Sequence, residues 1–147
     1  MRWSEVDEVA CPIAQGLSVI GDAWTLLIIR DCFKGYSRFE DFQSQTKASR
    51  ATLSARLSRL VDDGILEKRP YQEHPPRHEY FLTERGKSLL PVLMTLSDWA
   101  QTQLGAPSPP QPRVHTSCGH TFKPVVHCSE CGEPVENNVT FGGRRQS

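Results

Sequence analysis

This chain of 147 residues has no net charge, because 17 basic residues balance 17 acidic ones. The neutral total excludes a uniformly basic surface, so any contact with nucleic acid has to come from the local distribution of charge. Long apolar runs are also missing. The longest, Leu26 to Ile29, falls far short of the about 20 residues that a membrane-spanning helix needs. We therefore expect no transmembrane segment.

Two further absences narrow the function. Residues 1–10 are acidic and contain no apolar signal core, so we expect a cytoplasmic protein without a secretory leader. No nucleophile–base–orienter pattern and no glycine-rich phosphate loop is evident, so we expect no enzyme. In the reducing cytoplasm the five cysteines are better explained as metal ligands, reactive thiols or core residues than as disulfides.

Basic charge, although balanced overall, is concentrated in one short segment. Residues 47–61 contain Lys47, Arg50, Arg56 and Arg59 and no acidic residue. A run of this kind is often only the solvated face of a helix. The elements that surround it decide between that interpretation and a contact with nucleic acid.

Apolar residues at helical spacing predict helices over residues 12–21, 23–33 and 38–45. A fourth helix is predicted between Ser49, a plausible N-cap, and Gly64, which ends it. Its apolar stripe consists of Leu53, Leu57, Leu60 and Val61.

The segments that follow predict a hairpin and a long helix. Residues 65–71 and 77–82 are expected to form two strands joined by a Pro-containing turn at 74–76. Thr83 then caps a final helix that runs to about Leu104 and bends near its start at Pro91. The predicted fold class is α+β, mainly α, with a long C-terminal dimerisation helix and a small zinc-ribbon-like tail.

Two helices joined by a short turn and followed by a hairpin form a winged helix-turn-helix. The third predicted helix would cross the DNA backbone and the fourth would enter the major groove. Arg50 suits bidentate contact with guanine, and Thr52 and Ala55 suit contact with a thymine methyl group. Lys68 belongs to the basic residues of the hairpin. The predicted DNA-binding set is Lys47, Ser49, Arg50, Thr52, Ser54, Ala55, Arg56, Arg59, Arg69, Arg77 and His78.

Several short motifs within about residues 11–100 resemble those of the HxlR-type regulators, which are relatives of the MarR group. They are Cys11-Pro12, WTLLIIR at 24–30, TLSARL at 52–57, GIL at 64–66, PPRHEY at 75–80 and LTERG at 82–86. The chain departs from the usual pattern at Asp22-Ala23, where the family usually has Gly-Lys, and its tail is longer than that of the smallest members.

The resemblance implies a winged-helix homodimer that binds a pseudo-palindromic operator in double-stranded DNA, with the first and last helices at the dimer interface. It also implies a response to electrophiles, oxidants or a small metabolite. Some members sense such compounds through a cysteine in the position of Cys11. The alternative is a winged-helix and zinc-ribbon adaptor that binds proteins without recognising DNA sequence.

The thiols outside the tail have different expected roles. Cys11 precedes Pro12 at a helix start, where the helix dipole stabilises a thiolate, so it is a candidate redox sensor. A packed or capping cysteine is the alternative for this position. Cys32 lies within a predicted helix and is expected to be a small core residue.

The end of the chain has a different composition. Domain boundaries are expected as follows: a DNA-binding and dimerisation domain at 1–104, a Pro-rich linker at 105–112, a zinc-knuckle tail at 113–135 and an end without fixed structure at 136–147.

The tail repeats the pattern ligand-x-x-Cys-Gly, which predicts one structural Zn²⁺ in a tetrahedral site. The predicted ligands are His115, Cys118, Cys128 and Cys131. His120 and His127 are alternatives for the nitrogen ligand. Free thiols in a flexible tail are the simpler explanation of the same residues.

Overall fold

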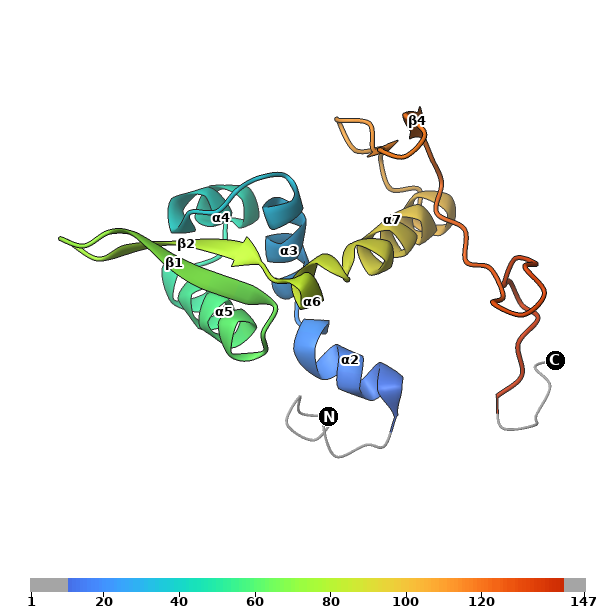
Figure 1. Cartoon of the computed structure of the whole chain (residues 1–147), viewed down its shortest axis with the longest axis horizontal. Coiled ribbons are helices and arrows are strands. Elements are labelled where there is room, and N and C mark those ends of the chain that lie inside the picture. Colours follow the sequence, from blue (N-terminus) through green and yellow to red (C-terminus); the bar gives the residue numbers. More distant parts are fainter. Residues whose placement is uncertain (1–10, 142–147) are drawn as a thin grey trace. The chain divides into compact units, whose positions relative to one another are not determined.

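The structure, a computed structural model, describes residues 11–141 and divides into two compact units between Leu90 and Pro91 (Figure 1). The expectations about a secretory leader at 1–10 and about residues 142–147 lie outside the described part. Among the described residues no single helix is long and apolar enough to cross a membrane. The α2 and α3 helices reach that length only as a pair, and they are bent by 75° at their break.

The first unit contains a helical cluster and one hairpin. Its elements are α2 (Pro12–Ile20), α3 (Thr25–Phe33), α4 (Phe39–Thr46), α5 (Arg50–Asp62), β1 (Leu66–Gln72), β2 (Arg77–Leu82) and α6 (Glu84–Lys87). The second unit is formed by α7 (Leu90–Leu104) and by two short strands, β3 (Val114–His115) and β4 (His120–Thr121).

The core of the first unit lies between α3, α4, α5 and the hairpin. The predicted stripe of α5 is confirmed, because Leu53, Leu57 and Leu60 are fully buried. Phe42 of α4 is also buried, and its ring meets that of Tyr80 on β2 edge-to-face at a centroid distance of 6.4 Å. This packing fixes the orientation of α5, so its opposite side faces outward.

Most of the predicted boundaries agree with the structure within one or two residues. Ser49 is the N-cap of α5 and accepts a hydrogen bond from the backbone N–H of Thr52 at 3.1 Å. The α3 helix starts at Thr25 instead of Ala23. Asp22 precedes this start, and its carboxylate accepts hydrogen bonds from the backbone N–H groups of Trp24 (2.8 Å), the N-cap residue, and of Thr25 (2.9 Å), the first residue of the helix. These bonds satisfy two backbone donors at the N-terminus of α3.

The prediction of one bent helix from Thr83 to Leu104 is wrong, because the structure has two separate helices, α6 and α7. Pro91 is the second residue of α7. Proline has no backbone N–H to donate, so it fits the first turn of a helix and ends any helix that precedes it. The proline therefore starts a new helix and does not bend an existing one.

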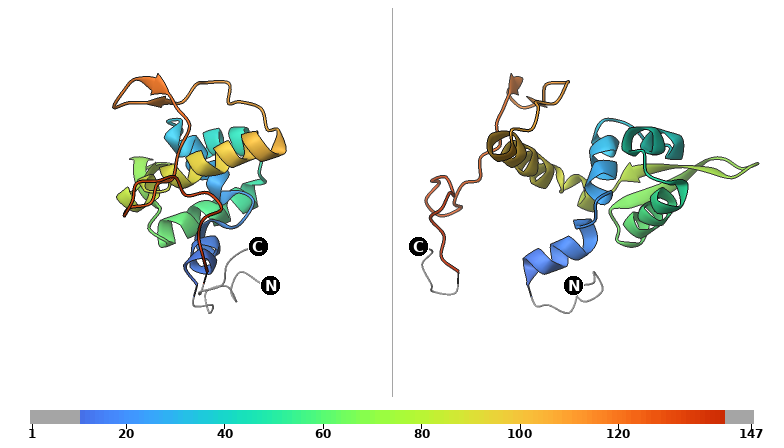
Figure 2. Two further views of the ribbon diagram at one scale, coloured as in Figure 1. Left: turned by 90° about the vertical axis from the view of Figure 1, so that its right-hand side faces the viewer. Right: turned by 180° about the vertical axis from the view of Figure 1, so that it is seen from behind.

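The hairpin is antiparallel and pairs Leu66 with Leu82 at its base. Its regular register is interrupted between Pro70 and Gln72, where a bulge leaves Tyr71 without a partner. The tip of the hairpin extends beyond α4 and α5 (Figures 1 and 2). A projecting hairpin next to α5 is the geometry of a wing.

The LTERG motif joins the end of the hairpin to the end of α5. The hydroxyl of Thr83 donates to the carbonyl oxygen of Gly64 at 2.5 Å and accepts from the backbone N–H of Gly86 at 3.1 Å. Arg85 donates to the carbonyl oxygen of Asp63 at 2.9 Å. Gly86 is buried so tightly that an added Cβ would overlap the carbonyl oxygen of Ile65. This motif holds the wing against α5.

Candidate nucleic-acid interface

A tight turn connects α4 to α5. Lys47 ends α4 in the left-handed conformation, with φ of 59°, and its side chain is exposed. Ala48 is buried beneath the turn, and its N–H donates to the hydroxyl of Thr46 at 3.3 Å. Because the turn is anchored by buried groups, the angle between α4 and α5 is fixed, as a helix-turn-helix requires.

The outward side of α5 carries small residues. Ala51, Ser54, Ala55 and Ser58 are all exposed, so this side has no bulky side chain that would keep a DNA groove at a distance. The Arg50 guanidinium lies over the ring of Phe39, 4.8 Å from its centroid, at the exposed start of the helix. The predicted contact residues Arg50, Ser54 and Ala55 are therefore accessible, whereas Thr52 is half-buried and hydrogen-bonded to Ser49.

Two of the predicted phosphate contacts are engaged within the chain. Nε of Arg56 lies 3.4 Å from the Asp22 carboxylate. Arg59 pairs with Asp63 at 3.3 Å and donates to the carbonyl oxygen of Ser18 at 3.2 Å. The role of these two arginines in binding phosphate stays a prediction. To bind phosphate, each arginine has to replace its contacts within the chain by contacts with the DNA backbone.

Basic residues of the wing are also held in place. The Arg69 guanidinium lies 4.5 Å from the ring centroid of Phe81 and is ion-paired with Glu67. Lys68 and Arg77 are exposed, whereas His78 is half-buried. The wing therefore offers exposed cations at positions where a neighbouring DNA backbone would lie.

Arg38 is a cation that the sequence analysis missed. Its guanidinium lies 4.3 Å from the ring centroid of Tyr71, at the bulge of the wing, and the residue forms a β-bridge with Glu79. Ser37 supports the bridge, since its hydroxyl donates to the Glu79 carboxylate at 2.7 Å. No local pattern could reveal this contact, because its partners are far apart in the sequence.

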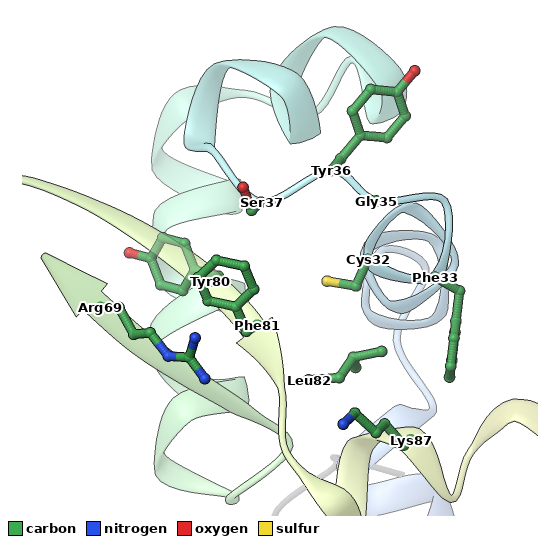
Figure 3. Close-up of a pocket in the computed structure, with 10 residues that line it drawn as sticks. All are labelled: Cys32, Phe33, Gly35, Tyr36, Ser37, Arg69, Tyr80, Phe81, Leu82 and Lys87. Carbon is green, nitrogen blue, oxygen red and sulfur yellow. The ribbon is translucent and has the colours of Figure 1, made fainter. Parts of the chain in front are cut away.

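The two cysteines of the first unit lie in different surroundings. Cys11 is the half-buried N-cap of α2 and makes no side-chain capping bond. Cys32 lines an open pocket of about 430 Å³, and its sulfur points from α3 toward β2 (Figure 3). Burial, together with the negative charge of Asp31, raises the pKa of Cys32 to about 12. This thiol therefore stays protonated at neutral pH and is a poor nucleophile.

The pocket beside Cys32 combines cationic and aromatic side chains. Arg69 and Lys87 line it together with Tyr80 and Phe81, whereas the ring of Tyr36 points away (Figure 3). Cations next to aromatic faces suit a small anionic molecule with an apolar body.

The predicted metal ligands lie in two pairs. Sγ of Cys118 lies 3.6 Å from Nδ1 of His115. Hydrogen bonds from the backbone N–H groups of Cys131 and Glu130 lower the pKa of the Cys128 thiol. No three metal-binding side chains lie together anywhere within residues 11–141.

The turn between α4 and α5, the outward face of α5 and the paired strands define a winged helix-turn-helix protein. Comparison with known proteins agrees with this class. A family model of HxlR-like helix-turn-helix proteins matches residues 19–108. The chain is 38% identical to an uncharacterised HTH-type transcriptional regulator of Mycobacterium tuberculosis, Rv3095, over 87% of this chain and 82% of that protein.

Two solved structures are similar as well. The crystal structure of PA1607, a candidate transcription factor, has a TM-score of 0.80 at 32% identity and covers 95% of this chain and 99% of its own. The redox regulator HypR in its oxidised form has a TM-score of 0.58 at 31% identity and covers 63% of this chain and 97% of its own. The chain belongs to the HxlR-like helix-turn-helix family and is a transcriptional regulator of that type.

Proposed function

We propose that the protein is a cytoplasmic, homodimeric regulator that binds a pseudo-palindromic operator through α5 and the wing. The observation that carries this proposal is the outward face of α5, where small residues are exposed and the cations Lys47 and Arg50 lie at its N-terminal end. Such a face allows close approach of the helix backbone to base edges, and the cations supply phosphate and guanine contacts.

Fluorescence anisotropy with duplex DNA tests the proposal. The purified protein should bind DNA from upstream of its own gene at least about 1,000-fold more tightly than a shuffled duplex. The affinity should fall with rising salt, because bound phosphates release counterions. Equal binding to both duplexes at every salt concentration would favour the adaptor alternative.

Two helices carry apolar residues that this single chain leaves exposed. On α2 these are Ile13 and Leu17, which are 67% and 44% exposed, and on α7 they are Leu96 and Trp99, which are 46% and 54% exposed. Each pair lies at helical spacing and forms a stripe on one face of its helix. A second copy of the chain that covers these stripes is the simplest partner. The family resemblance supports this choice, because it implies a dimer interface formed by the first and last helices.

We assign an oxidant or electrophile response to Cys11 and not to Cys32, whose thiol stays protonated. One structural relative is named a redox regulator, which supports a thiol-based response in this chain. Peroxide should weaken operator binding by the wild type and by Cys32→Ser, while Cys11→Ser stays unaffected. Loss of the response in Cys32→Ser alone would refute the assignment.

A response to a small metabolite is assigned to the pocket beside Cys32. Small aromatic carboxylic acids serve as probes, since the cations Arg69 and Lys87 line the pocket together with the rings of Tyr80 and Phe81. A binding acid should raise the unfolding temperature of the wild type, and Lys87→Ala should abolish the increase. An equal increase in both proteins would place binding elsewhere.

A further inference from the structure

Two segments of the tail adopt the same turn. In residues 115–119 the N–H of Gly119 donates to the carbonyl oxygen of His115 at 2.7 Å. In residues 128–132 the N–H of Gly132 donates to the carbonyl oxygen of Cys128 at 2.9 Å. Both glycines have the left-handed conformation, with φ of 76° and 75°. The sequence repeat His/Cys-x-x-Cys-Gly is therefore also a structural repeat.

Each turn closes a short antiparallel pair. The first lies between β3 and β4, where His115 faces His120. The second is closed by a β-bridge between His127 and Pro134 and by the N–H of Val135, which donates to the carbonyl oxygen of Val126 at 2.8 Å. A turn of this kind at the end of a hairpin, with a candidate ligand on each side, is the arrangement expected of a zinc knuckle.

The spacing of the first ligand pair fits a metal ion. Zinc bonds of about 2.3 Å to sulfur and about 2.0–2.1 Å to nitrogen, at a tetrahedral angle, place the two ligand atoms about 3.6 Å apart. Sγ of Cys118 and Nδ1 of His115 lie 3.6 Å apart. The ring of Phe122 lies beside the imidazole at a centroid distance of 5.7 Å.

The second turn directs backbone donors at sulfur. The N–H of Glu130 donates to Sγ of Cys128 at 3.4 Å. The Nδ1–H of His127 donates to the carbonyl oxygen of Gly132 at 2.8 Å, so only its Nε2 is available to a metal. Cys128 and Cys131 are the two thiols of the second turn, and His115 is preferred as the nitrogen ligand because it already lies against Cys118.

The tail has no core that could hold its hairpins together. No side chain within residues 105–141 is buried. Apolar residues that a small domain would normally bury are exposed, among them Val125 at 58% and Phe141 at 64%. Short segments without a core usually depend on a metal or a disulfide for order.

We propose that the tail binds one structural Zn²⁺ per chain through His115, Cys118, Cys128 and Cys131. Because the described residues hold these ligands as two separate pairs, binding brings the two turns together. Residues 122–125 connect the two antiparallel pairs, so the change of backbone conformation that brings the turns together falls in this segment. Four protein ligands leave no open position, so the zinc is structural and not catalytic.

The test uses the full-length protein and needs no variant at first. Elemental analysis after zinc loading and dialysis should give about one zinc per chain. X-ray absorption should show three sulfur atoms at about 2.3 Å and one nitrogen at about 2.0–2.1 Å. A chelator should make the three tail thiols reactive without changing the helical circular dichroism. Absence of zinc, with the three tail thiols already reactive before the chelator is added, would overturn the proposal.

Paired variants then test the ligand assignment. Cys118→Ser and Cys131→Ser should lose the bound zinc, and Cys32→Ser is their matched control and should keep it. His115→Ala should remove the nitrogen ligand, whereas His127→Ala should retain one zinc with an unchanged absorption spectrum. Zinc lost from His127→Ala but kept by His115→Ala would overturn the assignment. None of these outcomes depends on DNA binding, so the zinc proposal stands or falls independently of the operator proposal.

Discussion

Arg50 and Lys47 lie on either side of the Ser49 cap but are expected to contribute differently to binding. Arg50 starts α5 with its guanidinium over the ring of Phe39, so its planar donors are held in one orientation. Lys47 is an exposed point charge in the turn before the helix. The first arrangement suits recognition of one base, and the second suits attraction to phosphate.

Arg50→Ala should relax preference at one base pair of the operator and cost about 1–3 kcal/mol there. Lys47→Ala should weaken binding to all duplexes and reduce the salt slope by about one. Anisotropy titrations on the operator and on single-base variants at several salt concentrations separate the two effects. Equal losses on every duplex for both variants would contradict the assignment of groove contacts.

Gly86 shows why a small residue is needed at the junction of wing and helix. An added Cβ would lie 2.9 Å from a methyl group of Leu82 and would overlap the backbone of Ile65. Gly86→Ala should therefore lower the free energy of unfolding by about 1–3 kcal/mol, measured by urea denaturation. The neighbouring Lys87→Ala removes only a surface ion pair with Glu84 and should cost less than about 1 kcal/mol. A Gly86→Ala variant as stable as Lys87→Ala would refute this explanation.

Among the elements, those with strong local signals were predicted well. The α5 helix has an N-cap, one apolar stripe and a terminating glycine, so its bounds followed from the sequence. The split between α6 and α7 was missed, because Pro91 is equally compatible with a bend and with a new first turn. The two glycine turns of the tail coincide with the ligand-x-x-Cys-Gly repeat from which the sequence predicts a zinc site. The contact of Arg38 with Tyr71 depends on tertiary packing and has no local signal.

The capping of α3 by Asp22 has a pH dependence with a definite sign. Burial alone would raise the pKa of Asp22. Hydrogen bonds from Thr25 and Trp24 and the charge of Arg56 lower it by more, so the net pKa lies below the usual value of an aspartate. A lowered folded-state pKa means that the carboxylate stabilises the fold above its unfolded pKa of about 3.9. This contribution is lost as the pH falls through the lower, folded-state value.

Asp22→Asn keeps the cap oxygen but removes the charge, so it should cost about 0.3–1 kcal/mol at pH 6. Asp22→Ala also removes the cap and should cost about 0.5–2 kcal/mol. The free energies of unfolding are measured with urea from pH 6 downward. Those of the wild type and Asp22→Asn should become equal at low pH, while that of Asp22→Ala stays lower. A constant gap between the wild type and Asp22→Asn would contradict the role of the charge.

At the scale of the whole molecule, the exposed stripe of α7 predicts a dimer. Light scattering at micromolar concentration should give twice the mass of the 16.6 kDa chain. Trp99→Glu places a charge within the stripe and should shift the protein toward monomer. Gln101→Glu adds the same charge on the opposite side of α7 and serves as the control. A monomeric wild type would contradict the dimer proposal.

The symmetry of the operator depends on both dimerisation and DNA recognition. A two-fold dimer places two copies of α5 about 34 Å apart, which corresponds to one turn of DNA. The operator should then consist of two inverted half-sites at that spacing. This prediction depends on two observations together, the outward face of α5 and the exposed stripe on α7.

Selection from a random duplex library tests the central claim most directly. The full-length protein is mixed with the library, and the retained duplexes are sequenced over several rounds. We predict enrichment of an inverted repeat with half-site centres about 10–10.5 base pairs apart, and loss of preference at one position of each half-site for Arg50→Ala. Retained duplexes without a common sequence would contradict the account of this protein as a sequence-specific regulator.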